Sequence, residues 1–194
     1  MHRSHFMSLL AMPTETGHVL LPLARAAICR ELGQTPPAVS DADWLRTPGA
    51  SFVTLTKDGQ LRGCIGTLAA HRPLADDVTA NAIAAAFRDP RFKPLTSDEF
   101  TVVSIEVSLL SPAESLTWED EAGALAQLRP DIDGVIFQYG HHRSTFLPQV
   151  WEQLPDRAEF MAQLKYKAGL PPDFWSSDVK LSRYTVSKWR ETDR

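Results

Sequence analysis

The stretch LRGCIG, residues 61–66, holds the side chains best suited to chemistry in this chain of 194 residues. Cys64 lies within it, and Arg62 precedes the cysteine by two positions. A cysteine reacts as its thiolate, and a nearby cation favours that form. Gly63 and Gly66 remove side-chain bulk, which lets a ligand or another backbone segment come close. The stretch therefore predicts either a reactive thiol at a ligand site or a small structural residue in a tightly packed strand.

A β-hairpin over residues 51–68 is predicted to position Cys64, because apolar and polar residues alternate on both sides of a central turn. A three-residue loop of residues 57–59, with its glycine left-handed next to a bulge, pairs Leu55 with Leu61. In this register the apolar face holds Val53, Leu55, Leu61 and Ile65. The polar face holds Thr54, Thr56, Arg62 and Cys64. We therefore expect the thiol and the guanidinium to share a face.

Glu106 and Arg91 are the candidate residues outside this hairpin. Glu106 lies at the middle of the polar face of an alternating segment, residues 99–112, which predicts a strand. Its carboxylate could accept a proton, or it could pair with Arg62 if the two strands share a face. Arg91 lies in RDPRF, residues 88–92, where its charge could hold an anion or simply end the preceding helix.

The sequence gives no motif that would identify a cofactor or a metal site. His141 and His142 follow a predicted turn near Gly140. Consecutive strand residues point to opposite faces, so we do not expect these two rings to bind one metal ion. The chain contains no H-E-x-x-H, no G-x-G-x-x-G, no P-loop and no G-x-S-x-G motif. Nucleotide-binding and serine-hydrolase functions are therefore disfavoured, and the cofactor stays unidentified.

Composition restricts the class of protein further. Hydrophobic residues make up 43% of the chain and charged residues 23%, which is typical of a globular protein. The net charge of −4 argues against nucleic acid as a partner. Two cysteines without C-x-x-C spacing fit a reducing cytoplasm. We expect no export signal, no membrane span, and a disordered N-terminus over residues 1–14, with Met7 or Met12 as alternative starts.

Hydrophobic periodicity predicts the elements around the hairpin. Helices are expected over residues 16–33, 72–90, 118–129 and 156–169. Strands are expected over 99–112 and 179–189, with a second hairpin over 133–150. We expect the first helix to become regular just before Pro22, since proline removes a helical N–H, and Thr117 to cap the third.

The order of these elements predicts an α+β fold, because helices and hairpins do not alternate as strict βαβ units. The expected architecture is a largely antiparallel sheet flanked by helices. Residues 15–194 are expected to form one domain made of two closely joined lobes, because no independent linker separates them.

Five segments resemble one protein family. They are FVTLTKDGQLRGCIGTL, DPRFKPL, IEVSLLSP, FLPQV and KAGL, in that order between Phe52 and Leu170. On these segments the chain is identified as a member of the AMMECR family, whose prokaryotic members are called AmmeMemoRadiSam system protein A. LRGCIG is the hallmark of that family, whereas the other segments are not specific when taken singly.

The resemblance implies a two-lobed α+β domain with the hallmark hairpin beside a cleft between the lobes. It also implies two partners, a Memo-like protein related to metal-dependent extradiol dioxygenases and a radical S-adenosylmethionine enzyme. It supplies no reaction. The chain departs from the family at Lys165 and Tyr166, where a cysteine is frequent, and at His142 and Ser144, where arginine and glycine are frequent.

These observations give two hypotheses. In the first, an inter-lobe cleft binds a small molecule or a modified side chain, and the protein acts as an enzyme or enzyme component. Its candidate catalytic residues are Cys64 and Glu106. Its candidate ligand contacts are Arg62, Gly63, Gly66, Arg91 and His142. In the second, the protein is a non-catalytic adaptor whose LRGCIG hairpin docks on a protein partner, and Cys64 is structural.

Overall fold

The computed structural model describes residues 13–191, so nearly all of the N-terminal segment expected to be disordered lies outside the described residues. The chain divides into two compact units. Unit 1 runs up to Leu110 and resumes at Ser187, and unit 2 comprises Ser111–Val186. Within residues 13–191, no helix is both long enough and apolar enough to cross a membrane.

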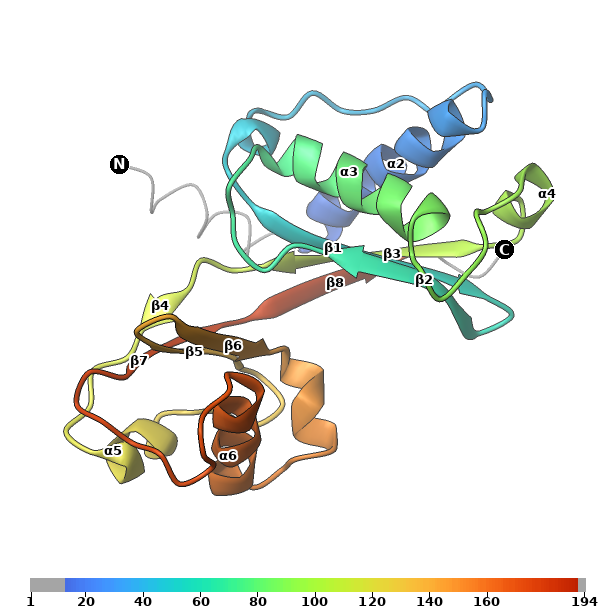
Figure 1. The fold of residues 1–194 in the computed structure, drawn as a ribbon. Helices are drawn as coiled ribbons and strands as arrows, with labels where there is room; N and C mark the ends of the chain where they lie inside the picture. Colours follow the sequence, from blue (N-terminus) through green and yellow to red (C-terminus); the bar gives the residue numbers. More distant parts are fainter. Residues whose placement is uncertain (1–12, 192–194) are drawn as a thin grey trace. The chain divides into compact units, whose positions relative to one another are not determined.

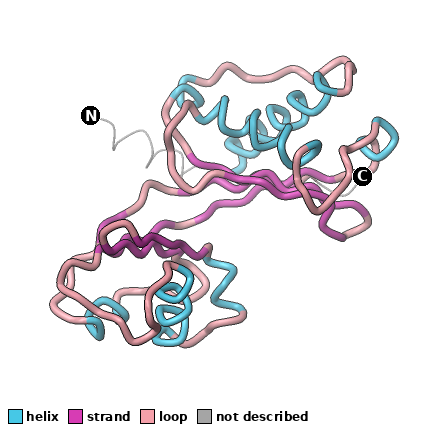
Figure 2. Tube along the Cα trace, viewed as in Figure 1, coloured by secondary structure: helices cyan, strands magenta, loops and turns pink. Residues whose placement is uncertain are grey.

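Unit 1 is a four-stranded sheet with its two long helices on one face (Figure 1). The strand order is β2-β1-β3-β8. The strands are β1 (Ala50–Lys57), β2 (Gln60–Gly66), β3 (Ser104–Leu110) and β8 (Val186–Arg190). The helices are α2 (Pro13–Glu31), η1 (Asp43–Arg46), α3 (Leu74–Phe87) and α4 (Ser97–Phe100). Figure 2 shows the same separation of helices from strands within this unit.

The core of unit 1 lies between the sheet and helices α2 and α3. Val53, Leu55 and Ile105 are fully buried on the sheet side. The alanines of α3 permit a close approach of this helix to β2, and the contact is closest at Gly63. A β-carbon built on Gly63 would lie 2.1 Å from the carbonyl oxygen of Ala85. Only glycine fits there, because the opposing atom belongs to the backbone and cannot rotate away.

A buried carboxylate fixes the first turn of α3 to β1. Asp77 has no exposed surface and accepts hydrogen bonds from the backbone N–H and the hydroxyl of Ser51 at 2.8 and 2.7 Å. Thr67, Arg72 and Asn81 donate three more, at 2.8, 2.9 and 3.0 Å. A buried carboxylate is stable only when it is compensated in this way. The network therefore holds the start of α3 against the strand that carries Ser51.

The hairpin of β1 and β2 has a different turn from the one predicted. Its loop is the two-residue turn Asp58-Gly59, with φ values of 52° and 75°. The expected three-residue loop is wrong because Asp-Gly accommodates positive φ at both positions, which suits a two-residue turn. The bulge lies further along β2: Leu55 pairs with Gly63 and Thr56 with Leu61, so residue 62 is the extra one.

Two helix boundaries also differ from the predictions. Helix α2 begins at Pro13 and contains Pro22 in its interior. Burial of Leu20 and Leu23 on either side of this proline outweighs the missing hydrogen bond. The expected helix over 118–129 is shorter, α5 (Glu121–Ala126), because Asp120 rather than Thr117 caps it by accepting a hydrogen bond from the Gly123 N–H at 2.7 Å.

Unit 2 is a second four-stranded sheet, in the order β4-β7-β5-β6. Its strands are β4 (Glu114–Ser115), β5 (Gly134–Tyr139), β6 (His142–Phe146) and β7 (Lys180–Tyr184). Its helices are α5, η2 (Pro148–Glu152) and α6 (Arg157–Lys167). Asp156 caps α6, and Trp151 stacks on Phe160 in the core with ring centroids 3.7 Å apart. The predicted α+β class with antiparallel pairing is confirmed, with the strands divided between two sheets.

The strand predicted over 179–189 is two strands that belong to different sheets. β7 pairs with β4 and β5 in unit 2, and β8 lies beside β3 in unit 1. The break falls at Thr185, which exchanges hydrogen bonds with Ser111. The single predicted strand is wrong because side-chain alternation continues through the break and does not reveal which sheet each half joins.

We predict that Gly63→Ala lowers the free energy of unfolding by about 3 kcal/mol, since its new methyl group would overlap the Ala85 carbonyl. Gly140→Ala is the control, because Gly140 has a φ of +57° and open space around it. Its cost should come from backbone strain alone, about 1 kcal/mol. Urea denaturation of both variants measures the difference. Equal losses would show that α3 does not press on β2 at residue 63.

Candidate functional site

Cys64 lies on the face of the unit 1 sheet opposite α3. Thr54 is paired with Cys64 on one side and with Glu106 on the other. Paired residues of neighbouring strands point to the same face, so these three side chains form a row across β2, β1 and β3. Gly63 faces α3, and its neighbour Cys64 therefore points away from the helix. The prediction that Thr54 and Cys64 share the polar face is confirmed.

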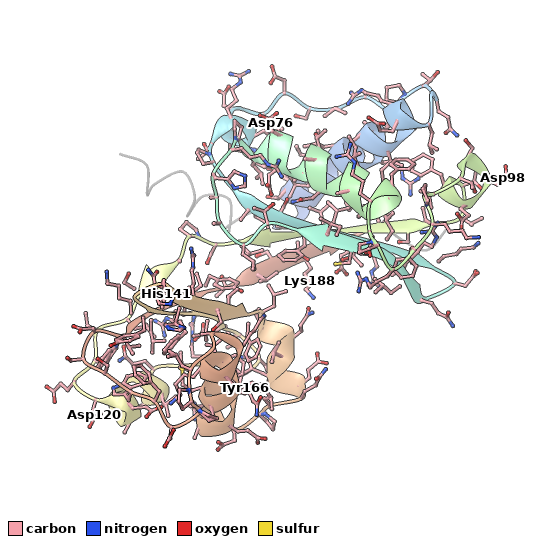
Figure 3. The ribbon with its side chains drawn as sticks, viewed as in Figure 1. Asp76, Asp98, Asp120, His141, Tyr166 and Lys188 are labelled. Carbon is pink, nitrogen blue, oxygen red and sulfur yellow. The ribbon has the colours of Figure 1, made fainter. Side chains whose placement is uncertain are left out.

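The row continues onto β8. Arg190 forms an ion pair with Glu106, with 3.0 Å between its Nη2 and the carboxylate Oε2. Lys188 precedes Arg190 by two positions on the same strand and is exposed (Figure 3). We call Cys64, Thr54, Glu106 and Arg190 the Cys64 row.

The contacts of Cys64 explain how the thiol is held. The Thr54 hydroxyl donates a hydrogen bond to Sγ, with the two atoms 3.3 Å apart. The backbone N–H of Cys64 donates to Asp89 Oδ2 at 2.9 Å, and its carbonyl accepts from Arg91 Nη2 at 3.3 Å. Because β2 is an edge strand, these peptide groups would otherwise point into solvent. Asp89 and Arg91 therefore take the place of a neighbouring strand at Cys64.

Asp89 and Arg91 are themselves tightly paired. Asp89 is buried, and it accepts hydrogen bonds from Nε and Nη2 of Arg91 at 3.0 and 2.7 Å and from the Arg91 N–H at 3.1 Å. The guanidinium holds the pKa of the Asp89 carboxyl well below its usual range. In return, the hydrogen bonds to Asp89 raise the pKa of Arg91, and the nearby charge of Cys64 adds a smaller effect in the same direction. The cation beside Cys64 is thus Arg91.

Arg62 is turned toward α4, and the prediction that it shares a face with Cys64 is wrong. Its guanidinium donates to both carboxylate oxygens of Glu99 at 3.1 and 2.9 Å, and to the Lys93 carbonyl at 3.0 Å. The physical reason is the bulge, which makes residue 62 the extra residue of β2 and breaks the strict alternation. These bonds to Arg62 lower the pKa of Glu99 to about 2.

Glu106 also has a different partner from the one considered in the sequence. It pairs with Arg190 and not with Arg62. Thr54 separates it from Cys64, and strands are about 4.8 Å apart, so the carboxylate and the thiol belong to positions roughly 10 Å apart. The Thr54 hydroxyl is therefore the group that contacts the sulfur, and Glu106 could exchange a proton with it only through an intermediate.

The two glycines of LRGCIG both have packing partners. Gly63 lies against Ala85, and Gly66 lies under the ring of Phe52, where an added β-carbon would meet Cγ at 2.1 Å. Phe52 is on the same face as Cys64, since residues 52 and 54 of one strand alternate with the buried Val53. Phe52 therefore flanks the Cys64 row, two residues from Thr54 along β1.

His142 belongs to unit 2. Its Nδ1 lies 2.9 Å from the Ala168 carbonyl, which can only accept, so Nδ1 is the donor of this hydrogen bond. The expectation that His141 and His142 point to opposite faces is wrong, because their ring centroids are 4.2 Å apart. His141 lies in the two-residue turn after β5 and so does not follow strand alternation. That His142 touches the same ligand as Cys64 stays a prediction.

The other departures from the family pattern have local partners in unit 2. Ser144 donates to the Leu164 carbonyl at 2.6 Å. Lys165 is buried, and its Nζ donates to Glu121 at 2.7 Å and to the Phe174 carbonyl at 3.0 Å. These contacts join α6 to the rest of unit 2. In the described part of the chain, no three His, Cys, Asp or Glu side chains are grouped so that they could hold a metal ion.

Thr54, Phe52 and Arg190 are the site residues that sequence reasoning missed as contacts. Strand alternation placed Thr54 on the correct face, but only pairing of β1 with both neighbours makes it the residue at the sulfur. The sequence did not predict that Arg190 pairs with Glu106, because the two residues lie 84 positions apart and nothing indicated that their strands belong to one sheet.

Comparison with known proteins gives a consistent picture. A family model described as AMMECR1 matches residues 21–189. A protein of Methanothermobacter thermautotrophicus is 36% identical over 190 residues, which cover 95% of this chain and 99% of the relative. A protein of Saccharolobus islandicus is 37% identical over 187 residues, covering 92% and 82%. The crystal structure of an uncharacterised protein from Pyrococcus horikoshii matches with a TM-score of 0.73 and 33% identity over 90% of both chains.

We predict that Glu99→Gln removes part of the acid sensitivity of this protein. Because the pKa of Glu99 is lowered from 4.5 to about 2, its ion pair stabilises the fold above pH 4.5 and loses that effect as the pH falls toward 2. At pH 7 the variant should be less stable by about 1 to 2 kcal/mol. Melting temperatures from pH 7 to pH 2.5 should show this difference shrinking on acidification.

The matched control is Asp98→Asn, because Asp98 is the exposed neighbour of Glu99 on α4 (Figure 3). Its melting curve should follow that of the unmodified protein at every pH. A stability difference for Glu99→Gln that is the same at pH 7 and pH 2.5 would contradict the assignment of this carboxylate to Arg62.

Proposed function

Because the chain belongs to the AMMECR1 family, we propose that it binds a small molecule or a modified protein side chain at the Cys64 row. One observation carries this proposal. A thiol, a hydroxyl, a carboxylate and a guanidinium stand side by side on one sheet face, supplied by four adjacent strands. Such a set of hydrogen-bonding groups can fix the orientation of a ligand, with Cys64 at one end.

Rigidity of the site supports a binding role. Both peptide groups of Cys64 are hydrogen-bonded to Asp89 and Arg91, and the strand is packed on α3 through Gly63. The thiol therefore starts from a defined position and loses little conformational entropy when it meets a ligand.

As part of an enzyme, Cys64 is the candidate nucleophile or covalent contact, and Thr54 stabilises its thiolate by donating to Sγ. Glu106 is the candidate proton acceptor, acting through Thr54 or through bound water. Its ion pair with Arg190 fixes the position of the carboxylate. The contacts support a ligand site more strongly than any particular reaction.

The partners and the compartment are part of the same proposal. The resemblance of the LRGCIG hairpin to AmmeMemoRadiSam system protein A supports joint action with a Memo-like protein and a radical S-adenosylmethionine enzyme. The two free cysteines, Cys29 and Cys64, fit the reducing cytoplasm.

A second candidate function is supported by two exposed leucines. Leu61 and Leu68 are 45% and 41% exposed. Leu61 is the second residue of β2, and Leu68 follows the last residue of β2 by two positions. Apolar side chains beside a rigid edge strand suit a protein-docking surface. In this adaptor function the hairpin would be the contact and Cys64 would be structural.

We predict that the two functions separate in a strain that lacks the gene. Cys64→Ala should fail to restore its growth phenotype and metabolite profile, while its melting temperature and co-purifying partners stay unchanged. Leu61→Ser should restore them. In the reverse pattern, Cys64→Ala is active, and Leu61→Ser is inactive and no longer co-purifies with its partners. That pattern would contradict the ligand-binding function and support the adaptor function.

We also predict that Cys64 is alkylated in the native protein and that Thr54→Val slows this reaction about 3- to 10-fold at pH 7, because one hydrogen bond to the thiolate is lost. Thr56→Val is the control, since Thr56 lies on the same face of the same strand but pairs with Leu61. Cys29 is only 6% exposed and should react only after unfolding. Mass spectrometry of the two cysteine peptides measures the rates, and equal rates in both threonine variants would remove Thr54 from the site.

A further inference from the structure

We propose that the ligand of the Cys64 row is an anion, and that Arg91, positioned by Asp89, is the residue that selects it. This inference rests on the proposed function, since it names the chemical class of the ligand at the same site. The class is an oxyanion, the carboxylate or phosphate group of a small molecule or of a modified side chain.

The first step of the argument is the position of Arg91. Its Nε and Nη2 bind the two oxygens of Asp89, and Nη2 also donates to the Cys64 carbonyl at 3.3 Å. Asp89 in turn accepts the Cys64 N–H at 2.9 Å. Three groups therefore form one closed unit, in which the orientation of the guanidinium and the path of the strand are fixed together.

The second step is the part of the guanidinium that stays free. An arginine side chain has five N–H donors, and the contacts to Asp89 and Cys64 use those of Nε and Nη2. Among residues 13–191, no acceptor is bonded to Nη1 of Arg91. The side chain is 54% exposed although its partner Asp89 is only 2% exposed. The open edge thus offers an incoming oxyanion two fixed donors beside the thiol.

The third step is local charge. Residues 88–93 carry three exposed cations, Arg88, Arg91 and Lys93, and one acid, which is the buried Asp89. On the neighbouring hairpin, Lys57 and Arg62 share the single carboxylate of Glu99. The whole chain has a net charge of −4. Residues 88–93 therefore carry a net positive charge beside Cys64 in a protein that is acidic as a whole, and this charge favours the approach of anions.

The inference gives Asp89 a role that helix capping does not explain. The Arg88 N–H closes the end of α3 on the Ala84 carbonyl, and the Leu95 N–H binds the Ala86 carbonyl. Asp89 contributes to neither contact. Its carboxylate is committed to Cys64 and Arg91, so it acts as the positioning residue of the pair.

A pair of alkylating reagents tests the proposal. In iodoacetate and iodoacetamide alike, the Cys64 thiolate forms an S–C bond and displaces iodide, and the thiol proton passes to the buffer. The reagents differ in that iodoacetate carries a carboxylate and iodoacetamide is neutral. The measured quantity is the ratio of the two rates at the Cys64 peptide, at pH 7 and low ionic strength. A change in thiol reactivity alters both rates and cancels in this ratio.

Arg91→Gln should lower the ratio about 3- to 10-fold relative to the unmodified protein, because a cation within a few ångströms of the reagent is lost. Arg91→Lys keeps the charge and should retain most of the ratio. Arg129→Gln is the matched control, since Arg129 is 48% exposed and binds the buried Asp133 of unit 2 in the same way. It should leave the ratio unchanged. Added salt should lower the ratio of the unmodified protein toward that of Arg91→Gln.

The inference would be overturned if the unmodified protein and Arg91→Gln gave the same rate ratio. It would also be overturned if Arg129→Gln lowered the ratio as much as Arg91→Gln does. If Arg91→Gln unfolds, Arg91→Lys and the salt series still decide, because a ratio insensitive to salt excludes a selecting charge. Acetate and inorganic phosphate, compared as protectants of Cys64 at equal ionic strength, distinguish the two oxyanions. If the rate ratios follow these expectations but a strain carrying Cys64→Ala is active, the proposed function fails while the anion preference beside Cys64 stands. The two failures are therefore distinguishable.

Discussion

The contact between Gly63 and the Ala85 carbonyl sets the position of the groups around Cys64. Without a side chain at residue 63, the backbone of α3 can lie directly against β2. Asp89 follows the end of that helix by two residues, and the close approach places its carboxylate at the N–H of Cys64. A side chain at residue 63 would overlap the Ala85 carbonyl, and moving the helix outward to relieve this overlap would lengthen the bond from Cys64 to Asp89. The packing of α3 on β2 and the position of Asp89 at Cys64 therefore depend on the same contact.

Two buried carboxylates at opposite ends of α3 each accept a hydrogen bond from a strand N–H. Asp77 accepts the N–H of Ser51 from β1, and Asp89 accepts the N–H of Cys64 from β2. Each is balanced by an arginine that stays partly exposed. The hairpin is thereby tied to one helix at two points by charge-assisted hydrogen bonds, which are stronger than neutral ones. The sheet is thereby fixed on the face that packs against α3, and the Cys64 row lies on the other face.

The sequence predicted much of this arrangement, and the errors have identifiable physical causes. Alternation placed Cys64 and Thr54 on one face correctly, because a period of two is a property of the strand itself. It failed for Arg62, since a bulge breaks the period and its position depends on which turn the hairpin adopts. The prediction chose the wrong turn and therefore assigned the wrong cation to the thiol.

By itself the sequence determined the positions of the long helices and of the two hairpins, and that the LRGCIG hairpin carries a thiol on its polar face. These features depend on residues close together in the chain. Only the tertiary structure decided that Arg91 and not Arg62 lies beside Cys64, that Arg190 pairs with Glu106, and that the last predicted strand serves two sheets. Those outcomes depend on strand pairing and helix packing between distant segments, for which local periodicity carries no information. The residues of LRGCIG thus determine that this segment forms a strand, whereas tertiary packing determines which side chains lie around Cys64.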